Sequence, residues 1–246
     1  MPPVSRSAPP LTGHTNSVAA VAVGRLGKRD VIVSGSLDTT VRIWDADGRQ
    51  VDAPLTGHNR WVTAVALGRL GDRDAIVSAS DDGTVRLWDA DGRQIGDPLT
   101  GHTGAVRAVA VGWLGDRDII ASASNDGTMW LWDADGRRIT DPLTGHTGAV
   151  TSVAVGRLDD RDVIVSASYD GTVRLWDADG RQIGDPLTGH ADWVFVMALG
   201  RLDDRDVIIS AGRDSTVRMW DASDRSTFVG PNDSWCLPPS SSPPPR

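Results

Sequence analysis

The histidines are the residues of this chain with the most evident capacity for chemistry. All five follow a glycine, in pairs at 13–14, 57–58, 101–102, 145–146 and 189–190, and serine and aspartate recur at fixed distances behind them. Serine, histidine and aspartate together form the triad of many hydrolases, in which the histidine takes the serine proton. Here the combination occurs five times, whereas catalytic function resides in single sites. We therefore interpret these residues as structural and predict no enzymatic activity.

Metal and cofactor sites are equally unsupported. Every histidine belongs to a Gly-His pair, so none is left over as a separate metal ligand. The segments related to Asp45-Ala46-Asp47-Gly48 begin like a calcium loop, but the chain contains no glutamate to supply the bidentate ligand of such loops. Cys236 is the only cysteine. We predict no metal, no cofactor and no disulfide within the chain.

The composition argues against nucleic-acid and membrane partners. The 246 residues carry a formal net charge of −8, whereas binding to a phosphate backbone requires a basic face. No apolar run approaches the length needed to span a bilayer, and no apolar signal-peptide core follows the first residues. With a single cysteine, a reducing compartment is the default, and we expect a cytoplasmic protein.

A repeat of 44 residues organises the chain. The Gly-His pairs are 44 residues apart, and a Trp-Asp pair follows each histidine after 30 residues. A fixed period of this size is typical of architectures in which each unit buries its faces against its neighbours. We predict a repeat domain over 13–232, an N-terminal extension over 1–12 and a Pro- and Ser-rich disordered tail over 233–246.

Each repeat contains four short apolar or alternating runs separated by turn residues. In the second repeat these runs predict strands at Trp61–Leu67, Ala75–Ser80, Thr84–Trp88 and Arg93–Leu99. The first run is apolar on both faces, as an inner strand should be, and the last carries polar residues and a proline, as an edge strand should. The pattern predicts a four-stranded antiparallel blade.

The Gly-His pair, the aspartate six residues before tryptophan, and the Trp-Asp pair together resemble the WD-repeat family. The resemblance implies an all-β propeller of four-stranded antiparallel blades, five in this chain. It implies that each sequence repeat supplies the outer strand of one blade and three strands of the next. It also implies a non-catalytic scaffold for protein partners.

The same resemblance implies a hydrogen-bonded tetrad in each repeat, whose connected network would fix the pairing of the strands. The five tetrads are His14, Ser34, Asp38 and Trp44; His58, Ser78, Asp82 and Trp88; His102, Ser122, Asp126 and Trp132; His146, Ser166, Asp170 and Trp176; and His190, Ser210, Asp214 and Trp220.

Three positions in each repeat vary while the framework stays nearly constant, and in the family these positions surround the upper mouth of the central channel. They lie three and five residues after the histidine and one residue before the tetrad aspartate. Several carry residue types that are enriched at binding hot spots or can bond a partner. The partner-binding residues that we predict are Trp61, Trp193, Phe195, Tyr169, Arg107, Arg213, Asp81 and Asn125. Neutral drift among duplicated repeats is the alternative.

Closure of the propeller is left open by the sequence, since the family usually has seven blades. Five blades can close as a ring, can be completed by a second copy or another partner, or can be a gene fragment. Residues 225–231 are the better candidate for the outer strand of the last blade, and Arg6–Leu11 is the weaker one.

We therefore expect a WD-repeat scaffold that binds a protein or peptide through the upper rim. A sugar-binding propeller is one alternative, but its aromatic residues should recur at one position in every blade. A sensor or regulatory segment of a larger multidomain protein is another.

Overall fold

A computed structural model describes residues 9–221, which contain eighteen strands and no helix. The strands are β1 (Val18–Leu26), β2 (Arg29–Ser36), β3 (Val41–Asp45) and β4 (Gln50–Leu55); β5 (Val62–Leu70), β6 (Arg73–Ser80), β7 (Val85–Trp88) and β8 (Gln94–Leu99); β9 (Val106–Leu114), β10 (Arg117–Ser124) and β11 (Met129–Asp133); β12 (Val150–Leu158), β13 (Arg161–Ser168), β14 (Val173–Trp176) and β15 (Gln182–Leu187); and β16 (Val194–Leu202), β17 (Arg205–Gly212) and β18 (Val217–Asp221).

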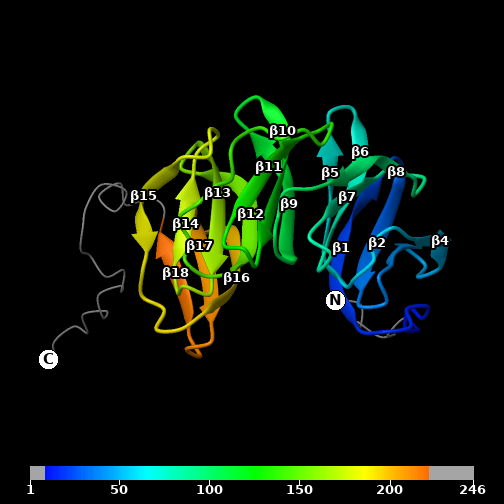
Figure 1. Cartoon of the computed structure of the whole chain (residues 1–246), viewed down its shortest axis with the longest axis horizontal. Coiled ribbons are helices and arrows are strands. Elements are labelled where there is room, and N and C mark those ends of the chain that lie inside the picture. Colours follow the sequence, from blue (N-terminus) through cyan, green and yellow to red (C-terminus); the bar gives the residue numbers. More distant parts are fainter. Residues whose placement is uncertain (1–8, 222–246) are drawn as a thin grey trace, which may run out of the picture.

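These strands form five antiparallel sheets, one for each repeat (Figure 1). In each sheet the strands follow one another in chain order, for example β1-β2-β3-β4, so every connection is a hairpin. The sheets of the first, second and fourth repeats have four strands, and those of the third and fifth have three. The predicted all-β fold of five WD blades is confirmed. The described residues include no helix that could cross a membrane.

The hairpin between the first two strands of each blade is longer than the sequence analysis predicts. The segment 68–74, expected to be a loop, is mostly strand, with only Gly71 and Asp72 as the turn. Gly71 has a φ of 62°, the left-handed conformation that a two-residue type II′ hairpin turn requires at its first position. In the fourth repeat, Asp159 and Asp160 both have positive φ, as in a type I′ turn. A two-residue turn lets the flanking polar residues pair as strand.

The outer strand of the third blade also departs from the prediction of four strands. The segment after β11 makes only two isolated bridges, Met129 with Leu143 and Trp132 with Arg138. In complete blades the outer strand contains a residue with positive φ, such as Gly96 at 65°. The third repeat has Thr140 there, and a β-branched residue disfavours the left-handed region. The third blade therefore lacks the residue with positive φ that the outer strands of the complete blades contain, and its outer segment does not pair continuously with β11.

The hydrophobic core lies between blades as well as within them. Val33 and Ile43 of the first blade pack in one buried cluster with Val62, Ile76 and Trp88 of the second. The other described neighbours repeat this arrangement, each Trp of the Trp-Asp pair joining the cluster of the preceding blade. Inner strands are apolar on both faces because a blade covers each face.

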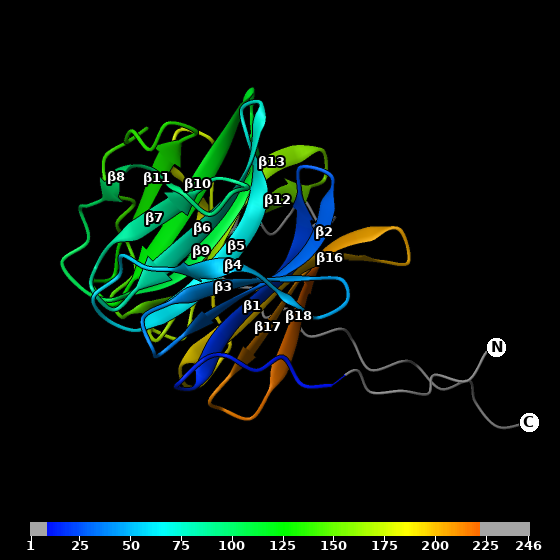
Figure 2. The same ribbon diagram turned by 90° about the vertical axis from the view of Figure 1, so that its right-hand side faces the viewer.

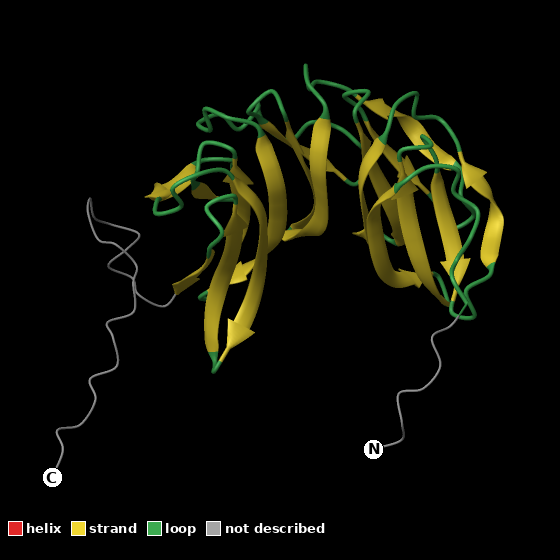
Figure 3. Cartoon of the chain, turned by 90° about the horizontal axis from the view of Figure 1, so that it is seen from below, coloured by secondary structure: helices red, strands yellow, loops and turns green. Residues whose placement is uncertain are grey.

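The five blades form an open arc. Figure 3 shows the first and fifth blades at opposite ends of it, and Figure 2 views the chain from the side of the first blade. The inner strands touch in the order β1, β5, β9, β12 and β16, and no strand of the first blade packs extensively on a described strand of the fifth. The candidate outer strand at 225–231, the tail at 233–246 and residues 6–8 of the weaker candidate Arg6–Leu11 lie outside the described residues.

Candidate interaction surface

In each predicted tetrad the histidine precedes the first strand of the blade, the serine lies in the second strand, the aspartate in the turn after it and the tryptophan in the third strand. The tryptophan Nε1–H donates to the serine Oγ over 2.9–3.0 Å, and the serine Oγ lies 2.8–2.9 Å from the histidine Nε2. The histidine Nδ1 lies 2.8–3.1 Å from the aspartate Oδ2. When Nδ1 carries the imidazole proton, each group donates to the next: the indole N–H to the serine oxygen, the serine O–H to Nε2, and the Nδ1–H to the aspartate.

A threonine is the fifth member of each network, and the sequence analysis missed it. The Thr40 hydroxyl donates to the Asp38 Oδ1 over 2.7 Å, its amide donates to the same oxygen, and the Thr15 amide donates to Oδ2. The same hydroxyl bond recurs in every repeat. The signal was present in the sequence as threonine two residues after every tetrad aspartate. The members are Thr40, Thr84, Thr128, Thr172 and Thr216.

The hydrogen bonds that the tetrad carboxylates accept lower the pKa values of these aspartates. Burial by itself raises the pKa of Asp82, but hydrogen bonds from His58 and Thr84 and the nearby imidazole outweigh it and hold that pKa well below its ordinary value. All five tetrad aspartates have lowered pKa values. Burial also lowers the pKa of His102, despite the opposing effect of Asp126. The third tetrad therefore contains a neutral imidazole beside an ionised carboxylate.

The tetrads are poorly arranged for hydrolysis. The histidine side chains are at most 6% exposed, and the five serines are buried. Each serine oxygen already bonds an indole and an imidazole. A nucleophile must reach a substrate carbonyl, and these oxygens lie inside the blades. Within residues 9–221, no three His, Cys, Asp or Glu side chains are grouped as metal ligands.

The variable rim positions are held at one end of every blade by the tetrad turn. In each repeat the amide of the residue before the tetrad aspartate donates to the carbonyl of the residue three after the histidine, over 2.7–2.9 Å. Tyr169 thus bonds Ala149, and Arg213 bonds Trp193. Two of the three variable positions, the third residue after the histidine and the residue before the tetrad aspartate, are therefore neighbours in each blade. The turn fixes where they lie.

Three predicted rim residues form an aromatic cluster between the fourth and fifth blades: Tyr169, Trp193 and Phe195. The rings of Tyr169 and Trp193 stack with their centroids 4.4 Å apart, and Phe195 meets both edge-on at 6.0 and 6.5 Å. Arg213 lies over Trp193, with its Cζ 4.7 Å from the ring centroid. The three aromatic side chains remain 36%, 39% and 45% exposed.

A polar cluster lies between the second and third blades. Arg107 donates through Nε to the Asn125 Oδ1 over 2.9 Å and through a terminal nitrogen to the Asp81 Oδ1 over 3.2 Å. These bonds satisfy the guanidinium in part and leave the arginine accessible. Trp61 lies in neither cluster and is exposed. The structure thus divides the predicted rim residues into an aromatic cluster, a polar cluster and a separate tryptophan.

Two tryptophans outside the rim have different environments. Trp113 is exposed near the hairpin at the end of β9, where its Nε1 donates to the Gly115 carbonyl over 2.9 Å. Trp130 is buried, stacks on Trp132 with centroids 5.8 Å apart, and lies under Arg138 at 4.2 Å. Other repeats pair an arginine with a glutamine here, so Trp130 and Arg138 replace that pair by a cation–π contact.

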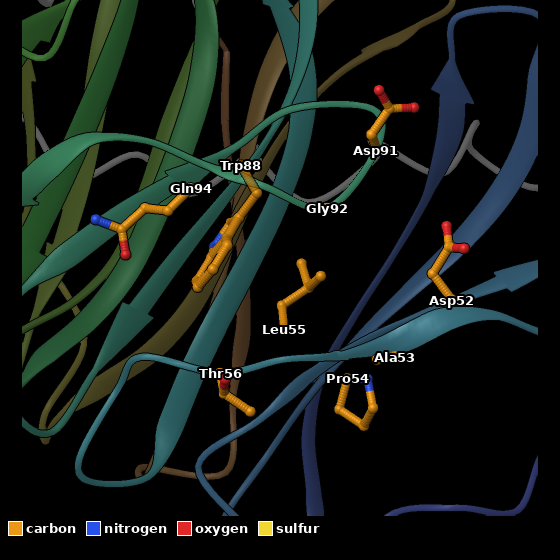
Figure 4. A pocket seen from close by; sticks show the side chains of 9 residues that line it. All are labelled: Asp52, Ala53, Pro54, Leu55, Thr56, Trp88, Asp91, Gly92 and Gln94. Atoms are coloured by element: carbon orange, nitrogen blue, oxygen red, sulfur yellow. The ribbon is translucent and has the colours of Figure 1, made fainter.

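A pocket of about 370 Å³ lies between the outer strand of the first blade and the β7–β8 turn of the second (Figure 4). Its lining consists of Asp52, Ala53, Pro54, Leu55, Thr56, Trp88, Asp91, Gly92 and Gln94. It meets the second tetrad only through the Trp88 ring and contains no rim residue. The pocket therefore lies apart from both rim clusters.

Comparison with known proteins agrees with this structure. The family model described as WD domain, G-beta repeat matches residues 6–45, 49–89, 93–133, 137–177 and 181–221. Each match after the first begins just before the outer segment of one blade and ends at the end of the third strand of the next, to within a residue. No curated protein matches the chain. Since the five matches cover most of its length, the chain belongs to the WD40 family.

Proposed function

We propose that this protein is a non-enzymatic scaffold that binds a protein or peptide segment through the upper rim, with the aromatic cluster as the main contact. WD40 repeats generally mediate protein–protein interactions. The observation that supports the proposal is the cluster of Tyr169, Trp193 and Phe195, whose residues stay more than a third exposed although their rings contact one another. We propose a cytoplasmic setting for this binding.

The side chains of sister repeats strengthen the proposal. At the position of Trp193 the third and fourth repeats carry Ala105 and Ala149, and at the position of Phe195 the fourth carries Thr151. The blade therefore forms without aromatic rings there. Clustered exposed aromatic side chains are typical of hot spots, where a partner removes them from water. Arg213 beside them offers hydrogen bonds to backbone carbonyls or acidic side chains of the partner.

The geometry favours a peptide over a sugar or a hydrolase substrate. A sugar would stack on a free aromatic face, but the Trp193 ring is already stacked on Tyr169 and approached by Arg213. Three of the four aromatic rim residues also gather between two blades, and no rim position carries an aromatic residue in every repeat. Catalysis by the tetrads would require their buried serines to reach solvent.

The proposal can be tested with peptides selected from a displayed random library on the full chain. Affinities of the selected peptides are then measured by calorimetry for the wild type and for the Trp193→Ala, Phe195→Thr double variant. We expect the variant to lose about 2 kcal/mol or more of binding free energy, roughly a 30-fold rise in Kd. Each substitution introduces a residue that a sister repeat already carries.

Trp113→Arg is the matched control, because Arg69 and Arg157 occupy the same position in neighbouring repeats. It removes an exposed tryptophan from a surface away from the rim and should leave peptide affinity unchanged. Thermal melting of all variants checks that the fold persists. Selected peptides that bind the double variant as tightly as the wild type would place the binding site elsewhere.

A further inference from the structure

A glycine in the first strand of each blade leaves space for a side chain of the next blade, and we call this glycine the socket. A Cβ added at Gly24 would lie 3.2 Å from the Leu67 Cδ1, and one at Gly112 would lie 2.6 Å from the Val155 Cγ1. Gly68 and Gly156 meet Val111 and Leu199 in the same way. None of these glycines has a positive φ, so close packing and not backbone conformation requires them.

A hydrogen bond at the adjacent hairpin fixes the same junction. The Gly27 amide donates to the Asp74 carboxylate of the next blade over 2.7 Å, and the Asp159 amide donates to Asp206 over 2.9 Å. The second and third blades make the equivalent bond at 2.8 and 3.0 Å. Four junctions in one chain therefore share one apolar contact and one polar contact, in one register.

The two ends of the arc carry the unmatched halves of this junction. At the fifth blade Gly200 is the socket, and among residues 9–221 no atom lies within 4 Å of a Cβ placed on it. At the first blade Val23 stands where the other blades present Leu67, Val111, Val155 or Leu199, and it is 79% exposed.

The surroundings of both sites are apolar and exposed as well. Val18 and Val21 flank Val23, while Val196 and Val217 belong to the face that carries Gly200. In the internal junctions the equivalents of Val18 and Val21 are buried, for example Val62 and Val65. Apolar surface of this extent is usually covered by a partner.

The donor and the acceptor of the polar contact also lie at opposite ends of the arc. By the period of 44 residues, the amide that follows Gly27 and Asp159 in the series is that of Asp203, at the free end of the fifth blade. In the internal junctions the accepting carboxylate belongs to residues such as Asp74 and Asp206. The equivalent residue of the first blade is Asp30. The Asp30 side chain is 77% exposed.

We propose that a second copy of this chain docks head to tail, its first blade on the fifth blade of its neighbour, with Val23 seated at Gly200 and Asp30 accepting from the Asp203 amide. The internal junctions show how the equivalent surfaces of neighbouring blades fit each other. A second copy makes this fifth junction without altering the other four, whereas closure within one chain would change them, since the two ends lie apart (Figure 3). The contact is heterologous, with different surfaces on the two copies.

Cysteine cross-linking tests the proposed register. At the internal sites, a Cβ placed on the glycine lies 2.7–4.0 Å from the Cβ of the residue that the next blade presents, so a disulfide, with roughly 3.8 Å between its Cβ atoms, needs only a small shift. We would prepare Val23→Cys and Gly200→Cys separately in a Cys236→Ser background, with a size tag on one of them. After mild oxidation of the mixture, we expect covalent dimers that contain one of each.

The single variants and the double variant separate the other outcomes. Each single variant alone should stay uncross-linked, and a chain with both cysteines should form intermolecular species. Cross-linked homodimers of one single variant would indicate a symmetric contact and overturn the proposal. A double variant that yields only an internal disulfide would show a closed ring, and a mixture without dimers would exclude the contact; both results overturn the proposal.

Light scattering measures the association of the full chain without introduced cysteines. The mean mass should rise with concentration, and Gly200→Leu should weaken association about tenfold or more by filling the socket. Trp113→Arg, away from the junction, should associate as the wild type does. A wild type that stays monomeric at all concentrations would contradict the proposal. Peptide binding at the rim is measured separately, so either proposal can fail alone.

Discussion

At the scale of single residues, the tetrads act as a repeated stabilising device. One aspartate carboxylate accepts from an imidazole, a threonine hydroxyl and two backbone amides, so it joins the Gly-His segment to the turn between the second and third strands. The buried serine of the second strand joins the histidine to the tryptophan of the third strand. Loss of one member leaves several buried donors unpaired, which is costly inside a blade.

Asp170→Asn tests this role through pH. The native pKa of Asp170 is well below its ordinary value, so in moderate acid the unfolded state binds a proton that the native state does not. The stabilisation is present above about pH 4 and is lost as pH falls below it. At neutral pH the variant should be about 1–3 kcal/mol less stable in urea unfolding. That difference should narrow steadily between about pH 5 and pH 3.

The control for this experiment is Asp97→Asn, which changes an exposed aspartate of β8 outside the tetrads. Its stability should follow that of the wild type across the same pH range. A difference between Asp170→Asn and the wild type that does not change with pH would show that the Asp170 carboxylate is not preferentially ionised in the native state.

At the scale of elements, single turn and bulge residues decide which strands form. The outer strand needs one residue in the left-handed region: Asp52 supplies it in the first blade with a φ of 59°, Gly96 in the second and Gly184 in the fourth. The third blade has Thr140 at this position, and its outer segment is reduced to two bridges. Arg138 also differs here, because in the complete blades a glutamine donates to the carbonyl of the residue with positive φ; the effect of Thr140 alone is what a substitution can test.

Gly184→Thr should reproduce the third blade in the fourth. We expect a loss of about 1–2 kcal/mol in unfolding free energy, because a non-glycine residue in the left-handed region is strained. Faster amide exchange in β15 (Gln182–Leu187) should accompany it. Gly184→Asp is the matched control, since Asp52 adopts this conformation at the equivalent position. Equal losses for threonine and aspartate would show that β-branching is not the cause.

At the scale of the whole molecule, stability is built from contacts between neighbouring blades, and the ends of the arc lack one neighbour each. Every internal junction uses a glycine socket, so the same substitution has different consequences along the chain. The aromatic cluster also depends on this scale, because Tyr169 belongs to one blade and Trp193 to the next. The relative placement of adjacent blades thus determines both stability and the binding surface.

Gly112→Val and Gly200→Val should therefore differ sharply. A valine at 112 would overlap Val155, and overpacking of this kind costs about 1–3 kcal/mol. A valine at 200 meets no neighbour in the described part of the chain and should change stability by no more than about 0.5 kcal/mol in dilute solution. Urea unfolding at low protein concentration measures both. Similar losses at the two positions would mean that the fifth blade is covered within a single chain.

Local patterns in the sequence determined the all-β fold and the five blades, since strand alternation, turn residues and fixed spacing act within one repeat, and the resemblance to the WD-repeat family supplied the grouping of each tetrad. The exact limits of the hairpins and the Thr40 series were equally local, but the sequence analysis overlooked the two-residue turns and the threonine two residues after each aspartate. Only the tertiary structure decided that the arc is open, that Trp61 lies apart and that Tyr169 stacks on Trp193. These features depend on the orientation between blades, which is set by close packing across junctions and accumulates along the chain.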